Sequence, residues 1–301
     1  MREALEYYAA WLSLHFVGAL PRPVARAFAA WIAMLIYRLR PRLDRAAMFN
    51  LRLAFPEWTD TQRRRTIRGL VRQLGWMAAE FTHFPDYTRE NIDSTVVLDG
   101  FENFATAQER GRGVLLLTGH MSAWELGPFA HAIYAKPIHF LARPLDNLRV
   151  DALVNRYRCL SGNQPLQKNQ SARATLNILR DGGTIGILAD VNMLPEEGVF
   201  VDFFGIPACS TTGIARLAQH TGAAVVPAYL VWDANLRKYR LCYEPAVELS
   251  ITGDEEHDIR ENTARFMKVI ENYARAHPEQ WLWIHKRWKT RPPGEPPLYP
   301  F

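Results

Sequence analysis

The spacing of apolar and polar residues divides the chain into a helical first part and an alternating second part. Two apolar stretches, at 7–20 and 24–37, open the sequence, and Pro21 and Pro23 between them would interrupt a continuous helix. A third helical pattern runs from about 61 to 84. We therefore expect the first part of the chain to consist of helices.

Short runs that favour strands begin after this helical part. They lie at 96–100, 113–120, 137–143, 184–190, 223–232 and 240–249. Segments with helical spacing alternate with them, at 101–110, 123–134, 147–160, 171–181, 212–221 and 258–277. This alternation predicts an α/β fold with a mixed central sheet flanked by helices.

The change of pattern also predicts the domain organisation. We expect an N-terminal helical, membrane-associated segment over residues 1–90 and an α/β domain over residues 91–301, with the boundary near 85–94. The proline-rich tail at 291–301 is typical of an extended arm.

Charge is concentrated in the helical part. Residues 1–72 contain thirteen arginines and five acidic residues, so they carry a net +8 while the rest of the chain sums to about −3. The arginines lie among apolar residues such as Trp11 and Trp31, which favours an anionic membrane surface over nucleic acid as the partner. We expect this segment to lie on the cytoplasmic face of the inner (plasma) membrane.

The way in which the segment meets the membrane stays open. Neither apolar stretch reaches the roughly 18 uninterrupted apolar residues expected of a spanning helix. The pattern favours a monotopic or re-entrant hairpin of two helices. A single tilted transmembrane helix and a pair of buried core helices are the alternatives.

The cysteines and the N-terminus indicate a reducing compartment. Cys159, Cys209 and Cys242 form no C-x-x-C pair, so neither a disulfide framework nor a structural zinc site is expected. Glu3 and Glu6 lie where a secretory signal would carry positive charge. We expect no metal and no cofactor.

A histidine at the end of a predicted strand is the strongest candidate for catalysis. His120 ends the run 113–120 and a helix is expected to follow, which is the edge where open α/β sheets bind ligands. If His120 lies in the turn and Glu125 in the first turn of that helix, the carboxylate can fix the tautomer of the imidazole. His120 could then take the proton from an alcohol that attacks a thioester, an acyl donor that needs no serine or cysteine nucleophile. Backbone amides at the start of the helix would suit the developing oxyanion.

The same residues have a structural interpretation. Ser122 and Glu125 match a capping box, in which the serine caps the helix and the glutamate returns a hydrogen bond. Spacing alone leaves both interpretations of Glu125 open.

At these residues the chain resembles the lipid A biosynthesis acyltransferases, the lauroyl and myristoyl transferases within the wider group of His-x4-Asp/Glu glycerolipid acyltransferases. Similar blocks follow in order over nearly the whole chain: NLRLAFPEW at 50–58, GHMSAWELG at 119–127, ARPLDN at 142–147, ILADVN at 187–192, GVFVDFFG at 198–205, VVPAYLVW at 225–232 and WLWIHKRWKTRP at 281–292. Several blocks in order are more specific than any one of them. The resemblance implies an O-acyltransferase with a glycerolipid acyltransferase-like fold.

The resemblance also implies roles for individual residues. His120 and Glu125 become a catalytic dyad, Arg143 an arginine that binds phosphate or orients the acceptor, and Asp190 and Gly198 contacts to the acceptor. The implied donor is a thioester of acyl carrier protein or coenzyme A. The implied acceptor is a hydroxyl of a lipid A-type or other glycolipid or phospholipid.

Two other functions fit the same residues. A thioesterase or esterase would use the His/Glu pair to activate water, and a non-catalytic lipid-binding module would not need His120.

The C-terminal block 281–292 mixes tryptophans with cations. Trp281, Trp283 and Trp288 are typical of an interfacial belt facing lipid head groups, but they could equally belong to a docked helix with a solvated cationic face. We expect docking, with a basic contribution to the cleft.

Overall fold

Seven strands form the central sheet of the computed structural model, which describes residues 1–167 and 171–301. In order across the sheet they are β1 (Val96–Asp99), β9 (Lys238–Tyr243), β8 (Ala224–Asp233), β2 (Val114–Thr118), β5 (Thr184–Leu188), β3 (His139–Ala142) and β4 (Gln164–Gln167). Neighbouring strands are parallel except β8 and β9, which form an antiparallel hairpin. The mixed sheet flanked by helices is thus confirmed.

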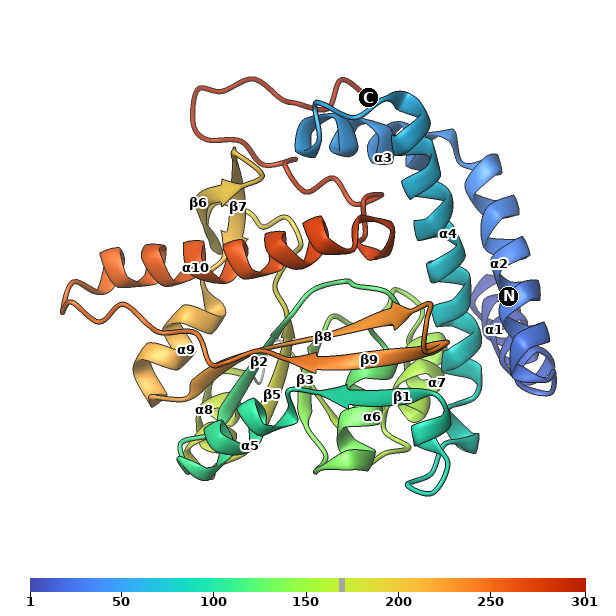
Figure 1. The fold of residues 1–301 in the computed structure, drawn as a ribbon, viewed down its shortest axis with the longest axis horizontal. Helices are drawn as coiled ribbons and strands as arrows, with labels where there is room; N and C mark the ends of the chain where they lie inside the picture. Colours follow the sequence, from blue (N-terminus) through green and yellow to red (C-terminus); the bar gives the residue numbers. More distant parts are fainter. Residues whose placement is uncertain (168–170) are drawn as a thin grey trace.

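Helices cover both faces of this sheet (Figure 1). On β2, Leu115 and Leu117 belong to the core formed with α8 (Ser171–Arg180), α9 (Gly213–Thr221) and α10 (Glu255–Ala276). Val114 and Leu116 point the other way, into the core formed with α5 (Phe101–Glu109) and α6 (Leu126–Tyr134). The uninterrupted apolar run of β2 follows from this burial on both faces.

Four helices precede the sheet: α1 (Arg2–Gly18), α2 (Arg22–Leu39), α3 (Pro41–Ala54) and α4 (Asp60–Thr82). Further helical elements are η1 (Phe84–Asp86), η2 (Ile92–Ser94), α7 (Leu148–Arg158) and η3 (Pro278–Gln280), of which the η segments are short 3₁₀ turns. Helices α3 and α4 bury Leu51, Leu70 and Val71 in the same core as α10, so this core extends across the expected boundary near 85–94. The helix α3 was not predicted.

A buried charge cluster holds α2 against α4. Glu80 on α4 is fully buried and forms ion pairs with Arg22 and Arg26 of α2. The Arg26 guanidinium also lies over the rings of Trp76 and Trp232, 5.0 and 4.5 Å from their centroids. Because removing one partner of a buried ion pair costs about 3 to 5 kcal/mol, this cluster fixes α2 on the body of the protein.

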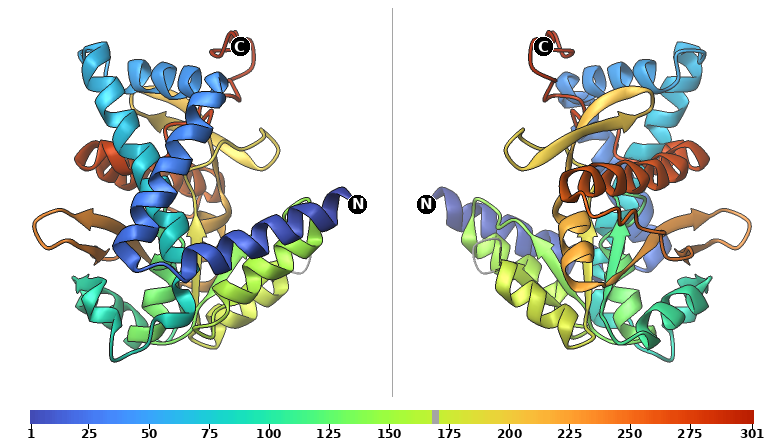
Figure 2. Two further views of the ribbon diagram at one scale, coloured as in Figure 1. Left: turned by 90° about the vertical axis from the view of Figure 1, so that its right-hand side faces the viewer. Right: turned by 90° about the vertical axis from the view of Figure 1, so that its left-hand side faces the viewer.

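The expected pair of N-terminal helices is present, and Figure 2 shows α1 and α2 meeting at an angle on one side of the molecule. The alternative of two buried core helices is wrong, because α1 has no buried residue and α2 buries only Ala25 and Ala29. Within residues 1–167 and 171–301, no helix combines the length and the apolar character needed to cross a membrane. Attachment of these helices to a membrane stays a prediction.

The C-terminal block is docked as expected, but not as a helix, and its cations Lys286, Arg287 and Lys289 line none of the cavities described below. Residues 281–292 form no helix, and Trp281, Trp283, Trp288 and Arg287 are all at most 1% exposed. These residues therefore form neither an interfacial belt nor a solvated cationic face. The Arg287 guanidinium instead donates to Cys209 O and Ser210 Oγ in the antiparallel hairpin of β6 (Gly198–Phe203) and β7 (Ile206–Thr211), which was not predicted.

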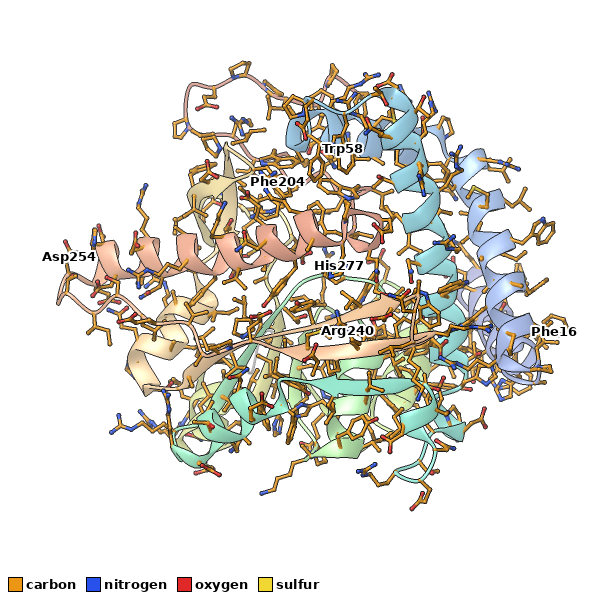
Figure 3. All side chains as sticks on the ribbon, in the orientation of Figure 1. Phe16, Trp58, Phe204, Arg240, Asp254 and His277 are labelled. Atoms are coloured by element: carbon orange, nitrogen blue, oxygen red, sulfur yellow. The ribbon has the colours of Figure 1, made fainter. Side chains whose placement is uncertain are left out.

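The tail returns to the N-terminal helices. Asn50 of α3 donates to Trp283 O and accepts a hydrogen bond from the Tyr299 hydroxyl. In Figure 3, Trp58 and Phe204 lie near this junction of α3 with the hairpin, and both rings pack on Phe55. Side chains from the two ends of the chain thus share one core.

Candidate active site

His120 lies in a tight turn two residues beyond the end of β2. The strand ends at Thr118 and α6 begins only at Leu126, so both the strand and the helix are shorter here than expected. Ser122 in this turn has a φ of 49°, in the left-handed region. Its backbone N–H donates to Gln280 O, and Met121 is bridged to Trp281. The C-terminal block therefore fixes the turn that carries His120.

Asp190 is the hydrogen-bond partner of His120. Its Oδ1 lies 2.7 Å from His120 Nδ1, and its Oδ2 accepts from the His120 backbone N–H at 2.8 Å. Oδ2 also accepts from Trp281 Nε1 at 2.9 Å. At Gly119 a Cβ would lie 3.0 Å from Oδ2, so glycine at this position allows the carboxylate its close approach.

The same contacts determine the protonation states of Asp190 and His120. Burial alone would raise the pKa of Asp190, but the charge and the N–H groups of His120, with the Trp281 N–H, lower it to about 2. Burial would lower the pKa of His120, but the Asp190 carboxylate outweighs it and the pKa is raised. Asp190 is therefore ionised and accepts the Nδ1–H, which leaves Nε2 to exchange a proton with substrate.

Glu125 has a different partner from the one expected. Its carboxylate forms a two-point ion pair with Arg158, with Nε to Oε2 at 2.8 Å and Nη2 to Oε1 at 2.5 Å. It makes no hydrogen bond to His120, although its charge is the last of the influences that raise the His120 pKa. The predicted His120–Glu125 hydrogen bond is wrong, because the guanidinium of α7 occupies both carboxylate oxygens.

The capping box is absent as well. Ser122 adopts a positive φ instead of the β-region backbone typical of an N-cap serine, and its hydroxyl donates to Gln73 Oε1. Glu125 itself stands at the N-cap of α6 and caps it with no side-chain hydrogen bond. Neither the His120–Glu125 hydrogen bond nor the Ser122–Glu125 capping box is therefore present.

A cavity of about 370 Å³ opens beside His120. Its lining includes His120 and the charged side chains of Glu125, Arg143 and Arg158. The rest of the lining is mainly apolar and comes from the sheet and α6, and it includes Leu116, Phe129, Leu188, Leu230 and Leu241. A charged region joined to an apolar one suits a substrate with a polar head and a hydrocarbon chain.

Arg143 is an exposed cation of this lining. It follows β3 and makes no hydrogen bond or ion pair with another residue in the part of the chain that the structure describes. An unpaired guanidinium at a cavity is suited to an anionic group. Its expected role in substrate binding stays a prediction.

Two expected acceptor contacts lie elsewhere. Asp190 is 2% exposed, does not line the cavity, and its carboxylate is already held by three protein donor groups, two of them from His120. Gly198 does not line the cavity. A Cβ at Gly198 would lie 2.7 Å from Ser210 O, so close packing of the hairpin accounts for glycine there.

Sequence reasoning missed Arg158 and the role of Trp281. Arg158 lies 33 positions from Glu125, and nothing in the local spacing indicates the pair. Trp281 belongs to a block whose composition indicates aromatic packing and says nothing of a hydrogen bond to Asp190. Among the described residues, no three or more His, Cys, Asp or Glu side chains are grouped to hold a metal ion.

Known proteins resemble this chain over nearly its full length. The model of the family described as bacterial lipid A biosynthesis acyltransferase matches residues 1–290. The lipid A biosynthesis lauroyltransferase of Escherichia coli (strain K12) is 30% identical, over 97% of this chain and 95% of that protein. The palmitoleoyltransferase of the same strain is 28% identical over the same shares, and its myristoyltransferase is 25% identical over 96% of this chain and 89% of that protein.

Proposed function

Because the chain belongs to the bacterial lipid A biosynthesis acyltransferases, we propose that it transfers a fatty acyl group from a thioester to a hydroxyl of a lipid A-type acceptor. The donor is acyl carrier protein or coenzyme A carrying the acyl group as a thioester. His120 is the general base, and Asp190 is the residue that positions it.

The hydrogen bond between His120 and Asp190 at the edge of the cavity is the observation that carries this proposal. With Nδ1–H donated to Asp190, Nε2 takes the proton of the acceptor hydroxyl as its oxygen attacks the thioester carbonyl. The C–S bond of the resulting tetrahedral species then breaks, and the imidazolium returns the proton to the departing thiolate. The products are an ester and a free thiol.

The cavity lining offers separate surfaces for the acyl chain and for the anionic part of a substrate. The acyl chain lies along the apolar part, where burial of its methylene groups contributes to binding. Arg143 and the charged edge of the cavity receive the anionic part of the donor or the acceptor. The Glu125–Arg158 pair forms the side of the cavity next to α7.

A location at the cytoplasmic face of the inner membrane belongs to this proposal. Eleven of the large apolar side chains that are exposed lie within residues 1–39, which supports contact of α1 and α2 with lipid. The arginines that follow α2 suit anionic head groups.

Purified protein with an acyl thioester, assayed with and without a lipid A-type acceptor, tests the function. We expect acyl transfer that needs the acceptor, and His120→Ala should lower turnover by about a hundredfold or more. Thioester hydrolysis with no transfer would favour a thioesterase. Turnover in His120→Ala close to that of the unaltered protein would remove His120 as the base.

A further inference from the structure

A second apolar cavity lies between the N-terminal helices and the body of the protein. Its volume is about 770 Å³, and residues of α1, α2, α4 and α7 line it. Apart from Ser13, Thr82 and Glu125, the side chains of this lining are apolar. We call it the helix cavity.

The helix cavity reaches the candidate active site. Glu125 lines both this cavity and the one beside His120, and its partner Arg158 also lines the latter. Glu125 therefore lies between the two cavities, and it is paired with an arginine that lines the one beside His120. An occupant of the helix cavity would have one end at the charged side of the site.

Helix α1 is also hydrogen-bonded to the loop that follows Arg143. Asn147, which caps α7, donates from Nδ2 to Glu3 O and to Glu6 Oε2 of α1, both at 2.9 Å. The loop that leads from Arg143 to Asn147 is thus fastened to α1. The helix that lines the helix cavity also supports the loop that carries Arg143.

The outer side of the helix cavity is apolar and open to the surroundings. Leu12 and Phe16 of α1 and Ile36 of α2 line it and are 59, 57 and 51% exposed. Figure 3 shows Phe16 at the outer edge of the N-terminal helices. Exposed apolar surface that continues into an apolar cavity matches a hydrocarbon environment better than water.

We propose that the helix cavity holds an acyl chain of the acceptor lipid, while the cavity beside His120 holds the acyl chain of the donor. This inference rests on the proposed function. A lipid acceptor has to bring its hydroxyl to His120 while its hydrocarbon stays out of water. An apolar path from the exposed faces of α1 and α2 to Glu125 meets both conditions.

Selectivity for acceptor chain length tests the proposal. Two acceptors are compared that have the same lipid A-type head group and the same reactive hydroxyl. The first carries long acyl chains and the second carries short ones. The ratio of kcat/KM for the long-chain acceptor to that for the short-chain acceptor is measured in detergent micelles. We expect the unaltered protein to favour the long-chain acceptor.

Two substitutions fill the helix cavity from opposite sides. Ala78 on α4 and Ser13 on α1 both line it and are exposed, so Ala78→Trp and Ser13→Trp place bulk in the cavity without disturbing the core. Each should lower the ratio by at least about ten-fold, the factor expected when two methylene groups are excluded from an apolar site. Ala27→Trp is the matched control, because Ala27 is an exposed alanine of α2 outside the cavity. It should keep the ratio of the unaltered protein.

The outcomes separate this proposal from the proposed function. An unaltered protein that acylates neither acceptor would contradict the proposed function itself. Transfer to both acceptors with the same ratio in all four proteins would overturn the helix-cavity proposal alone. An equal fall of the ratio in Ala27→Trp would also overturn it, in favour of a general membrane surface. A ratio that changes only when light scattering shows a change of oligomeric state would overturn it in favour of a second copy of the chain.

Discussion

The Asp190 carboxylate holds His120 at two points, the ring nitrogen Nδ1 and the backbone N–H. The backbone contact keeps the carboxylate from rotating away, so the ring contact fixes both the orientation and the tautomer of the imidazole. A third donor, the Trp281 indole, occupies the oxygen that also receives the backbone contact. His120, Asp190 and Trp281 are therefore linked by hydrogen bonds, and the contribution of each can be tested by substitution.

Replacing Asp190 with Asn should change both the rate and the pH dependence. An amide can donate to Nδ1 and so favour the wrong tautomer, and kcat should fall by about a hundredfold or more. The Asp190 charge raises the pKa of His120, so its loss lowers that pKa. The imidazole then stays unprotonated, and able to accept a proton, down to a lower pH. The acid limb of the kcat/KM profile should therefore move to lower pH. An acid limb that stays in place would contradict Asp190 as the partner.

Trp281→Phe should affect catalysis more than the same change at its neighbour. It removes the indole donor to Asp190, whereas Trp283→Phe removes a donor to Pro278 O and serves as the control. Both positions are fully buried, so the two variants lose similar packing. We expect kcat of Trp281→Phe to lie at least about ten-fold below that of Trp283→Phe, because a hydrogen bond to a charged group is worth about 1.5 to 3 kcal/mol. Equal kcat values would show that the indole donor has no part in positioning.

Glu125 and Arg158 should act as a unit. Glu125→Gln, Arg158→Gln and the double variant form a cycle in which we expect a coupling energy of about 1 to 3 kcal/mol from melting experiments, with kcat lowered in all three. The half-exposed helical pair Glu261–Arg265 is the control, for which at most about 0.5 kcal/mol is expected. Additive effects at Glu125 and Arg158 would indicate that Glu125 acts without its partner.

Arg143→Lys should weaken substrate binding. Lysine keeps the charge and loses the planar fork that binds an anionic group at two points, so KM for the donor or the acceptor should rise by about ten-fold. Arg149→Lys, also exposed but outside the cavity, is the control. Unchanged KM values for both substrates in Arg143→Lys would remove Arg143 from the binding site.

Charge placed on α2 should weaken membrane binding. Trp31 and Leu35 are 61 and 42% exposed, and Trp31→Glu with Leu35→Glu should lower the partition coefficient into anionic lipid vesicles by at least about ten-fold. Ile251→Glu, 76% exposed and distant in the chain, is the control. Deleting the N-terminal helices is a poorer test, because it would leave Glu80 buried without Arg22 and Arg26. Equal binding of the double variant and the control would contradict the membrane prediction.

Patterning predicted β1, β2, β3, β5, β8, β9 and most helices because burial imposes a period on neighbouring residues, but it missed β4 and the β6–β7 hairpin. It could not predict the partner of His120, since His120 and Asp190 lie 70 positions apart. Parallel pairing of β2 with β5 sets Thr118 beside Leu188, and two further residues along each strand lead to His120 and Asp190. Once the two strands are known to be neighbours, the pair follows from the register. Spacing along the chain gave Glu125 instead, which was near in sequence and is bound to Arg158.

Composition left the setting of the C-terminal block open for a different reason. Tryptophan and arginine occur both at membrane interfaces and in packed interiors, and the sequence alone does not distinguish the two settings. Arg287 is fully buried, and desolvation lowers its pKa to about 10. Carbonyl and hydroxyl acceptors in the β6–β7 hairpin make this burial possible, and that hairpin was itself missed.

The contacts from Gln280 and Trp281 to the turn at Ser122 and to Asp190 have a consequence for biosynthesis. A ribosome synthesises α1 and α2 long before Gln280 and Trp281, the residues that shape the His120 turn. If α1 and α2 bind lipid as proposed, a nascent chain can reach a lipid surface before its catalytic geometry exists. A premature stop shortly before Gln280 would leave His120, Glu125, Arg158 and Asp190 in the product and still yield an inactive enzyme.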